Sequence, residues 1–393
     1  MLKYRHIPFL SWLLGSMMML MLTACSSSDD EEGQGVGKKP ATLAVYVYAP
    51  EPTVGAQKNA VRHRANEGEV NISISAEGEI KSLQLWIYES TSGDYVGYLE
   101  TTEVASLNTG EGALYQIPVS DEFAASRPDV DVYVQANVKT ENCGVGTLDE
   151  NTNRANLMAA AKITTEHFGL GSLQTSVPPQ GLPMAGKLTV QPVVGEAPAL
   201  RVGNMSEVST VQLTRAVSKL RFVFAKTEDQ PTVRIISITM DAGMIPTEEY
   251  LFKTPASITY NTVAGELLSY EIEDIAETAD PTNYLYLGQE AQAYENLINE
   301  AASKQEPEKP EVTVYGPIYL RESDKQLAGT ITYTINGGDE QTADFQMQRA
   351  GDFSRNHTWI VYAYYAGSGN LQVQSLYVKD WSGKEINHNL YNW

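Results

Sequence analysis

A glycine-containing segment at residues 181–187 is the first whose residue types could do chemistry. Its sequence, GLPMAGK, matches the opening of a phosphate-binding loop, in which backbone amides and a lysine hold nucleotide phosphates. Leu188 stands where magnesium requires Ser or Thr, and Pro183 lacks an amide donor. No βαβ pattern brackets the segment. We therefore interpret it as a turn and expect no cofactor.

Two further patterns could bind metal ions, and both are incomplete. Asp149, Asn151 and Asn153 have the spacing that opens an EF-hand loop. Arg154 replaces the glycine of that loop, and Ala160 replaces its bidentate acid. The five histidines show no His-x-x-x-His spacing. The sequence predicts no metal site.

No signature of catalysis stands out. The chain has no Gly-x-Ser-x-Gly elbow, and none of its 49 acidic residues lies in a local glycosidase pattern. A triad built from scattered residues is left open by the sequence. We predict a protein that is not an enzyme, with a secreted hydrolase as the weakest alternative.

The N-terminus carries an export signal. Two basic residues precede an apolar run over residues 7–22, and the sequence LTAC follows at residues 22–25. The run is short for a membrane span, so residues 1–24 are interpreted as a signal peptide. Residues 22–25 resemble a bacterial lipobox. This resemblance predicts that Cys25 carries acyl chains such as palmitate and that they anchor the chain to the outer membrane as a lipoprotein.

Charge and composition narrow the partners and the fold. The 393 residues carry 28 basic and 49 acidic side chains, a formal net charge of −21, which argues against nucleic acid as a partner. The length favours two domains. The 22 tyrosines favour half-buried sheet faces, and hence an all-β fold.

Alternation of apolar residues predicts the strands. In residues 41–49, ATLAVYVYA, it places Leu43, Val45, Val47 and Ala49 on one face, although both faces are apolar. Helical spacing is confined to residues 151–162 and 290–304. Further strands are predicted at 70–75, 81–88, 114–119, 131–138, 211–224, 232–240, 312–320, 329–335, 358–365 and 371–378.

These elements predict two tandem β-sandwich domains with one or two short helices. Residues 25–40 are expected to be a flexible tether, residues 41–205 the first sandwich and residues 206–393 the second. Inside the first, residues 50–69 are interpreted as an exposed linker that carries basic residues, with an ordinary flexible loop as the alternative.

Several segments, in their order along the chain, resemble the Bacteroidetes fimbrillin family, the FimA-like subunits of type V pili. They are the lipobox, the strand 41–49, the arginine-bearing linker, LPM at 182–184, RAVSKL at 215–220, RNH at 355–357 before WIVY at 359–362, and YVKDW at 377–381. The resemblance spans residues 22–381 and implies transthyretin-like sandwiches in a subunit of a surface fimbria.

The resemblance also implies assembly by donor-strand exchange. In the family a trypsin-like protease cuts after a linker arginine and releases the first strand with its lipid anchor. Carried over here, cleavage follows Arg64 or, alternatively, Arg62, and the strand bearing Leu43 is removed. The partners would be other fimbrial subunits, and the chain would pass from the outer membrane to the cell-surface fimbrium.

A neighbour's C-terminal segment would then fill the groove. The apolar positions of this candidate donor segment are Leu371, Val373, Leu376, Val378, Leu390, Tyr391 and Trp393. The change of phase after Val373 indicates a bulge near Ser375. Alternatively, the last residues simply close the second sandwich.

Other roles stay open. The chain could be an uncleaved anchor, a tip subunit, or a surface glycan-binding lipoprotein that uses exposed aromatic rings, although Trp86, Trp359 and Trp381 are expected to be packed. The sequence identifies neither the adhesion ligand nor the protease. A first strand outside any sheet, or between two partners at a sheet's centre, would contradict the polymerisation hypothesis.

Overall fold

The computed structural model describes residues 41–49, 76–109, 112–194, 199–202, 210–286, 291–347, 349–351, 353–367 and 369–378. The predicted signal peptide, Cys25, the linker with Arg62 and Arg64, and the end of the chain with Leu390, Tyr391 and Trp393 lie outside the described residues.

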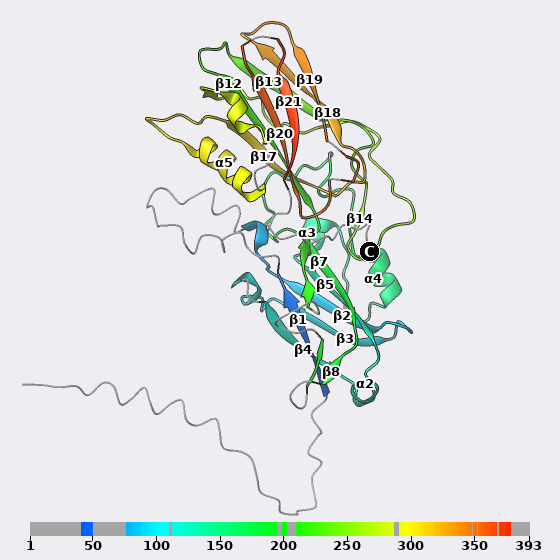
Figure 1. Cartoon of the computed structure of the whole chain (residues 1–393). Helices are drawn as coiled ribbons and strands as arrows, with labels where there is room; N and C mark the ends of the chain where they lie inside the picture. Colours follow the sequence, from blue (N-terminus) through cyan, green and yellow to red (C-terminus); the bar gives the residue numbers. More distant parts are fainter. Residues whose placement is uncertain are drawn as a thin grey trace, which may run out of the picture. The chain divides into compact units, whose positions relative to one another are not determined.

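Two five-stranded sheets enclose the first core. One has the order β10-β1-β9-β8, with β4 also paired to β1, and the other has the order β11-β7-β5-β2-β3 (Figure 1). The strands are β1 (Ala41–Tyr48), β4 (Ala113–Val119), β8 (Val193–Val194), β9 (Ala199–Val202), β10 (Val211–Gln212), β2 (Leu83–Glu89), β3 (Tyr95–Thr101), β5 (Val130–Ala136), β7 (Met184–Val190) and β11 (Thr214–Arg215).

The second of these sheets is buried on both faces. Leu85 of β2 and Val132 of β5 lie in the core shared with β1 and β4. Trp86 and Tyr133, on the opposite face of the same strands, pack into another apolar cluster. This is why the strands are apolar in both phases of the alternation.

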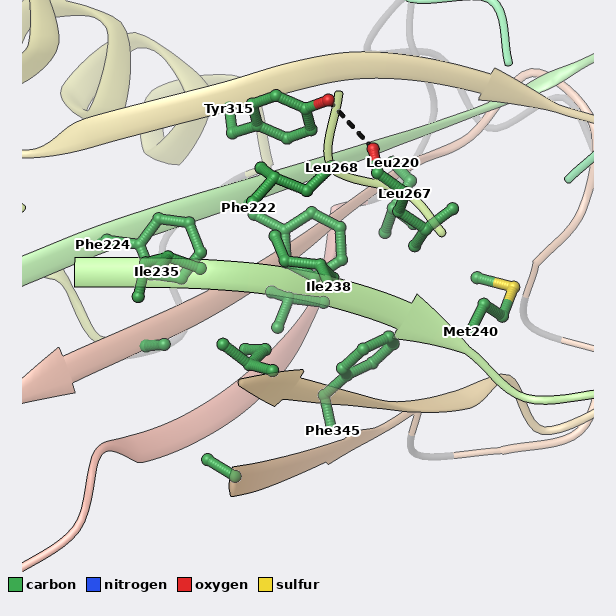
Figure 2. Close-up of a cluster of buried hydrophobic side chains, with 14 of the residues drawn as sticks. Leu220, Phe222, Phe224, Ile235, Ile238, Met240, Leu267, Leu268, Tyr315 and Phe345 are labelled. Atoms are coloured by element: carbon green, nitrogen blue, oxygen red, sulfur yellow. Dashed lines mark hydrogen bonds between the residues drawn. The ribbon is translucent and has the colours of Figure 1, made fainter. Parts of the chain in front are cut away.

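Two more sheets form the second core. Their orders are β16-β12-β20-β21, with β17 paired to β12, and β15-β13-β18-β19. The strands are β12 (Ser218–Thr227), β13 (Val233–Met240), β15 (Gly265–Glu266), β16 (Glu277–Thr278), β17 (Thr313–Leu320), β18 (Ala328–Ile335), β19 (Gln341–Gln346), β20 (Thr358–Tyr365) and β21 (Gln372–Val378). Figure 2 shows Phe222 of β12 and Ile238 of β13 in this core with Phe345, whose ring centroid lies 5.4 Å from that of Phe222.

Helices are few and short, so the all-β prediction is confirmed. They are α2 (Asp121–Ser126), α3 (Thr140–Cys143), α4 (Arg154–Ala160) and α5 (Ala291–Ser303), beside two 3-10 turns, η2 (Leu107–Thr109) and η3 (Pro281–Tyr284), and residues 76–78 are also helical. The two predicted helices correspond to α4 and α5. The prediction omitted α2, which is capped by Ser120, whose side chain accepts a hydrogen bond from the Phe123 amide. None of the described helices is long and apolar enough to cross a membrane.

The strand predicted at residues 211–224 is in fact three strands. β10 pairs with β1, β11 pairs with β7, and only β12 belongs to the second core. Buried apolar residues recur along the whole segment, at Val211, Leu213 and Leu220, and nothing local marks where the chain passes from one sheet to the next. The predicted domain boundary at residue 205 lies outside the described residues and stays a prediction.

Candidate functional site

Strand β1 lies inside its sheet, between two sets of partners. On one side it runs antiparallel to β4, from Ala41 opposite Val119 to Val47 opposite Ala113. On the other side it runs parallel to β9 and then to β10, with Val47 opposite Val211. This is the position between two partners that contradicts polymerisation by release of the first strand, as it was predicted from the sequence.

The sequence of β1 accounts for this central position. Leu43, Val45 and Val47 are fully buried in the core, and Ala44 and Tyr46, on the other face, are also buried. A strand that is apolar on both faces is typical of a sheet interior, whereas an edge strand would leave one ladder of backbone groups open. The apolar outer face was the signal for a central strand.

Backbone and side-chain contacts fix the end of β1. The Leu213 amide donates a hydrogen bond to the Tyr48 carbonyl at 2.8 Å, which extends the pairing beyond β10. Gly112 has a φ of +77°, and a Cβ on it would lie 2.8 Å from Cδ2 of Tyr48 and 3.0 Å from Cε1 of Tyr46. Only glycine lets this loop approach the two rings so closely.

The C-terminal candidate, by contrast, ends a sheet. β21 pairs with β20 in continuous register from Gln372 opposite Tyr364 to Val378 opposite Thr358. The expected bulge near Ser375 is wrong. β20 is buried on both faces, with Trp359 in the second core and Ile360 in the cluster with α5, so apolar residues in either phase fit a regular strand beside it.

Three segments that carry the family resemblance meet at one place. The Ala216 amide donates to the Pro183 carbonyl at 2.8 Å, and the Arg215 guanidinium donates to Oδ1 of Asn356 at 3.0 Å. The Asn356 amide donates to the Val217 carbonyl at 2.9 Å. These residues therefore join the strands of the first core to those of the second, a structural role that sequence reasoning missed.

Glu77, just after the linker region, belongs to the same junction. Its carboxylate accepts hydrogen bonds from Nζ of Lys219 at 3.2 Å and from the Tyr319 hydroxyl at 2.5 Å. Its carbonyl accepts from Nε of Arg215 at 2.8 Å. Burial, with the nearby charge of Glu77, raises the pKa of Tyr319 and keeps that hydroxyl a donor.

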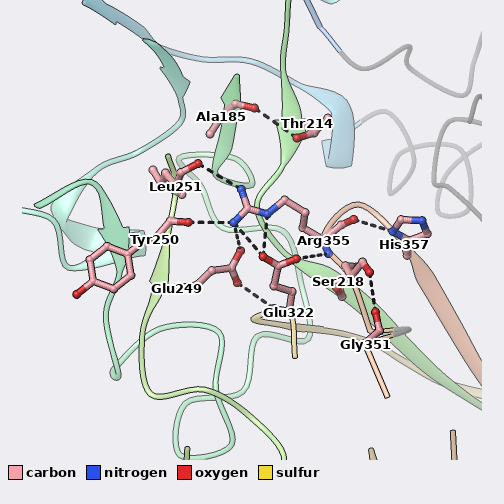
Figure 3. Close-up of polar contacts among 11 residues, drawn as sticks. Ala185, Thr214, Ser218, Glu249, Tyr250, Leu251, Glu322, Gly351, Arg355 and His357 are labelled. Carbon is pink, nitrogen blue, oxygen red and sulfur yellow. Dashed lines mark hydrogen bonds and ion pairs between the residues drawn. The ribbon is translucent and has the colours of Figure 1, made fainter. Parts of the chain in front are cut away.

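A second polar cluster surrounds Arg355, as Figure 3 shows. Its Nη2 lies 2.9 Å from Oε1 of Glu249 and 3.2 Å from Oε1 of Glu322. All three side chains are almost wholly buried, so two carboxyl groups share one guanidinium. Burial and the charge of Glu322 raise the pKa of Glu249 to about 8, although Arg355 opposes the shift.

The other candidate sites have structural roles among the described residues. Met184 opens strand β7 rather than a helix, and the side chain of Asp149 accepts a hydrogen bond from the Asn151 amide. Trp86 and Trp359 are fully buried, as predicted, while Trp381 lies outside the described residues. Cys143 is buried, which raises the pKa of its thiol. The described residues contain no group of side chains that could hold a metal ion.

No protein-family model and no curated protein matches the chain. Among solved structures, a C-terminally truncated form of the tip fimbrial protein Mfa3 from Porphyromonas gingivalis is 12% identical, with a TM-score of 0.47, over 87% of this chain and 99% of that one. A fimbrial assembly protein from Parabacteroides distasonis is 13% identical, with a TM-score of 0.40, over 86% and 96%. A candidate cell adhesion protein from the same organism is 12% identical, with a TM-score of 0.44, over 89% and 98%. These are Bacteroidetes fimbrial and adhesion proteins, the group that the sequence resembles.

Proposed function

We propose that the chain is a structural subunit of a surface fimbria, exported as a lipoprotein on Cys25 and assembled by donor-strand exchange after cleavage at Arg64 or Arg62. The ordered sequence segments support this role. The observation that carries the fimbrial role is the order of these segments along the chain. The position of β1, a buried strand between β4 and the β9–β10 pair, counts against release of the first strand, and the exchange mechanism has to account for it.

The central position of β1 changes the mechanism expected from the sequence. In the uncut chain β1 is hydrogen-bonded to partners on both sides, so it cannot be released as an edge strand could. This position contradicts simple exchange of an edge strand. Cleavage in the linker turns β1 into the end of a separate peptide, which can be displaced pairing by pairing. Exchange then requires an incoming strand and not the spontaneous opening of the sheet.

Displacement of β1 would leave an empty place between β4 and the β9–β10 pair, here called the slot, and another strand would have to fill it. It would expose unpaired backbone groups of β4 on one side and of β9 and β10 on the other, above the core space left by Leu43 and Val45. Each of these apolar side chains contributes about 1.5–3 kcal/mol on burial. A strand from another subunit restores both terms, which supports a homo- or heteropolymer.

For the donor we favour residues 379–393. Residues 372–378 already pair with β20 in the subunit's own sheet, so their donation would first cost that pairing. The segment beyond them includes the apolar residues Leu390, Tyr391 and Trp393. An uncleaved anchor, which would keep Cys25 and Arg64 joined, and a tip subunit are the alternatives within the same proposal.

The test is assembly of the purified protein after digestion with an arginine-specific protease. We expect ladders that resist SDS at room temperature from the wild type and from Lys58→Ala, the matched control in the same linker. The double variant Arg62→Ala/Arg64→Ala should stay monomeric. A surface-assembled form whose N-terminus is always acylated Cys25 would remove the stalk role and leave the anchor.

A further inference from the structure

A hollow on the first sandwich lies outside the strand-exchange machinery. It has a volume of about 360 Å³ and is lined by Tyr95, at the start of β3, and by the loop residues Glu150, Asn151, Thr152 and Asn153. Small-molecule sites begin at roughly 300 Å³. The hollow is therefore large enough for one small ring and its substituents.

Buried aromatic side chains hold this loop from beneath. The Trp86 indole donates a hydrogen bond to the Asp149 carbonyl at 2.9 Å, and the Tyr88 hydroxyl donates to the Thr152 carbonyl at 2.5 Å. Both donors are fully buried residues of the same face of β2. The loop backbone is thus fixed before any ligand arrives, which reduces the entropy lost on binding.

The far end of the loop is also fixed. Nη1 of Arg154 donates to the Ser90 carbonyl at 2.8 Å and forms an ion pair with Oδ2 of Asp131 at 3.0 Å. The positive charge of Arg154 is paired with Asp131. The described residues that line the hollow include no cation. Glu150 makes the lining acidic, within a chain of net charge −21.

The lining combines an aromatic ring with amide and carboxylate groups. Tyr95 is 50% exposed, and Tyr88 supports its ring edge-on, with 6.4 Å between the centroids. Asn151 supplies an amide that can donate and accept hydrogen bonds, and Glu150 supplies an acceptor, whereas Oδ1 of Asn153 accepts from the Asn156 amide at the start of α4. A sugar presents an apolar face of C–H groups and a rim of hydroxyls, which fits this combination.

We propose that this hollow binds one unit of a neutral saccharide, with the sugar's C–H face on the Tyr95 ring and its hydroxyls bonded to Asn151 and Glu150. The acidic lining selects against sialylated and sulfated sugars, because their charge would be repelled. This binding does not depend on fimbrial assembly, so the two proposals can fail separately.

The test is a titration of the whole chain, followed by NMR, with methyl glycosides of glucose, galactose, mannose and N-acetylglucosamine. We expect at least one of them to bind the wild type with a Kd of about 1 mM, typical of a small shallow site. Tyr95→Ala and Asn151→Ala should weaken it at least about tenfold, whereas Tyr95→Phe, which keeps the ring, should retain it.

Tyr270→Ala is the matched control. Tyr270 is 65% exposed and also lies edge-on to a more buried tyrosine, Tyr315, at 5.5 Å, but it belongs to the second core region. This variant should bind as the wild type does. The proposal is overturned if no neutral glycoside binds the wild type, if Tyr95→Ala binds unchanged, if both tyrosine variants lose binding equally, or if only sialyl or sulfated sugars bind.

Discussion

The time for which the cleaved first strand stays bound tests whether the burial of its side chains holds it in the slot. Leu43 is fully buried in the first core, between β4 and β9, and Leu43→Ala removes its contacts without touching either ladder. Truncation of a buried leucine to alanine costs about 2–5 kcal/mol. If that loss falls on dissociation, the cut fragment should leave roughly 30 to 4,000 times faster, since 1.4 kcal/mol corresponds to tenfold.

The assay is digestion with an arginine-specific protease, then timed size exclusion with mass spectrometry of the fragment that ends at Arg64. Thr42→Ala is the control, because Thr42 lies in the same strand and is only partly buried. As long as no incoming strand displaces it, the wild-type fragment should stay bound for far longer than the separation takes. A wild-type fragment that leaves at once, or a Leu43→Ala fragment retained equally long, would refute the idea that burial of β1 holds the slot closed.

Three further predictions concern the packing of the body. Burial raises the pKa of Glu249 from 4.5 to about 8. The stabilising contribution of its protonated form should therefore be complete below pH 4.5 and be lost as the pH rises through about 8. Urea titrations should show this fall in the free energy of unfolding with pH, and Glu249→Gln should flatten it. Glu77→Ala should lower the free energy of unfolding by roughly 3 kcal/mol, because it leaves Lys219 and Tyr319 short of a buried partner, whereas exposed Glu79→Ala should change it little. Gly112→Ala should cost more than Gly243→Ala in thermal melts, because both have positive φ but only Gly112 faces nearby rings; equal losses would show that backbone strain alone matters.

Much of the fold follows from alternation along single segments. Residues 358–365 and 329–335 were predicted within a residue or two of β20 and β18, because their apolar pattern is uninterrupted. The failures arise where a decision depends on distant partners. The sequence of β1 shows that both of its faces are apolar. It does not indicate that β4 pairs on one side of β1 and the parallel strands β9 and β10 on the other.

The junction shows the same limit for polar residues. Arg215 and Asn356 stand 141 positions apart, and their hydrogen bond exists only because two sheets end side by side. Glu77, in the unremarkable sequence AEGE, carries no signal of its own before Lys219 and Tyr319 are brought to it. The spacing of residues in a sequence indicates a polar site only when the interacting residues are close together in that sequence. The partners at this junction are far apart along the chain.

Together, these contacts bear on what cleavage in the linker would release. Upstream of residues 50–75, Tyr48 is held by the Leu213 amide at the end of the slot; downstream, Glu77 is fixed by a buried ion pair and by the Arg215 guanidinium. A cut between them therefore leaves Tyr48 and Glu77, the described residues on either side of it, held by different parts of the body. The downstream anchor belongs to the junction of the two cores, which β1 does not enter, so loss of β1 should empty the slot without loosening the junction. Hydrogen exchange after cleavage and displacement should then rise in β4 and β9 but not around Glu77.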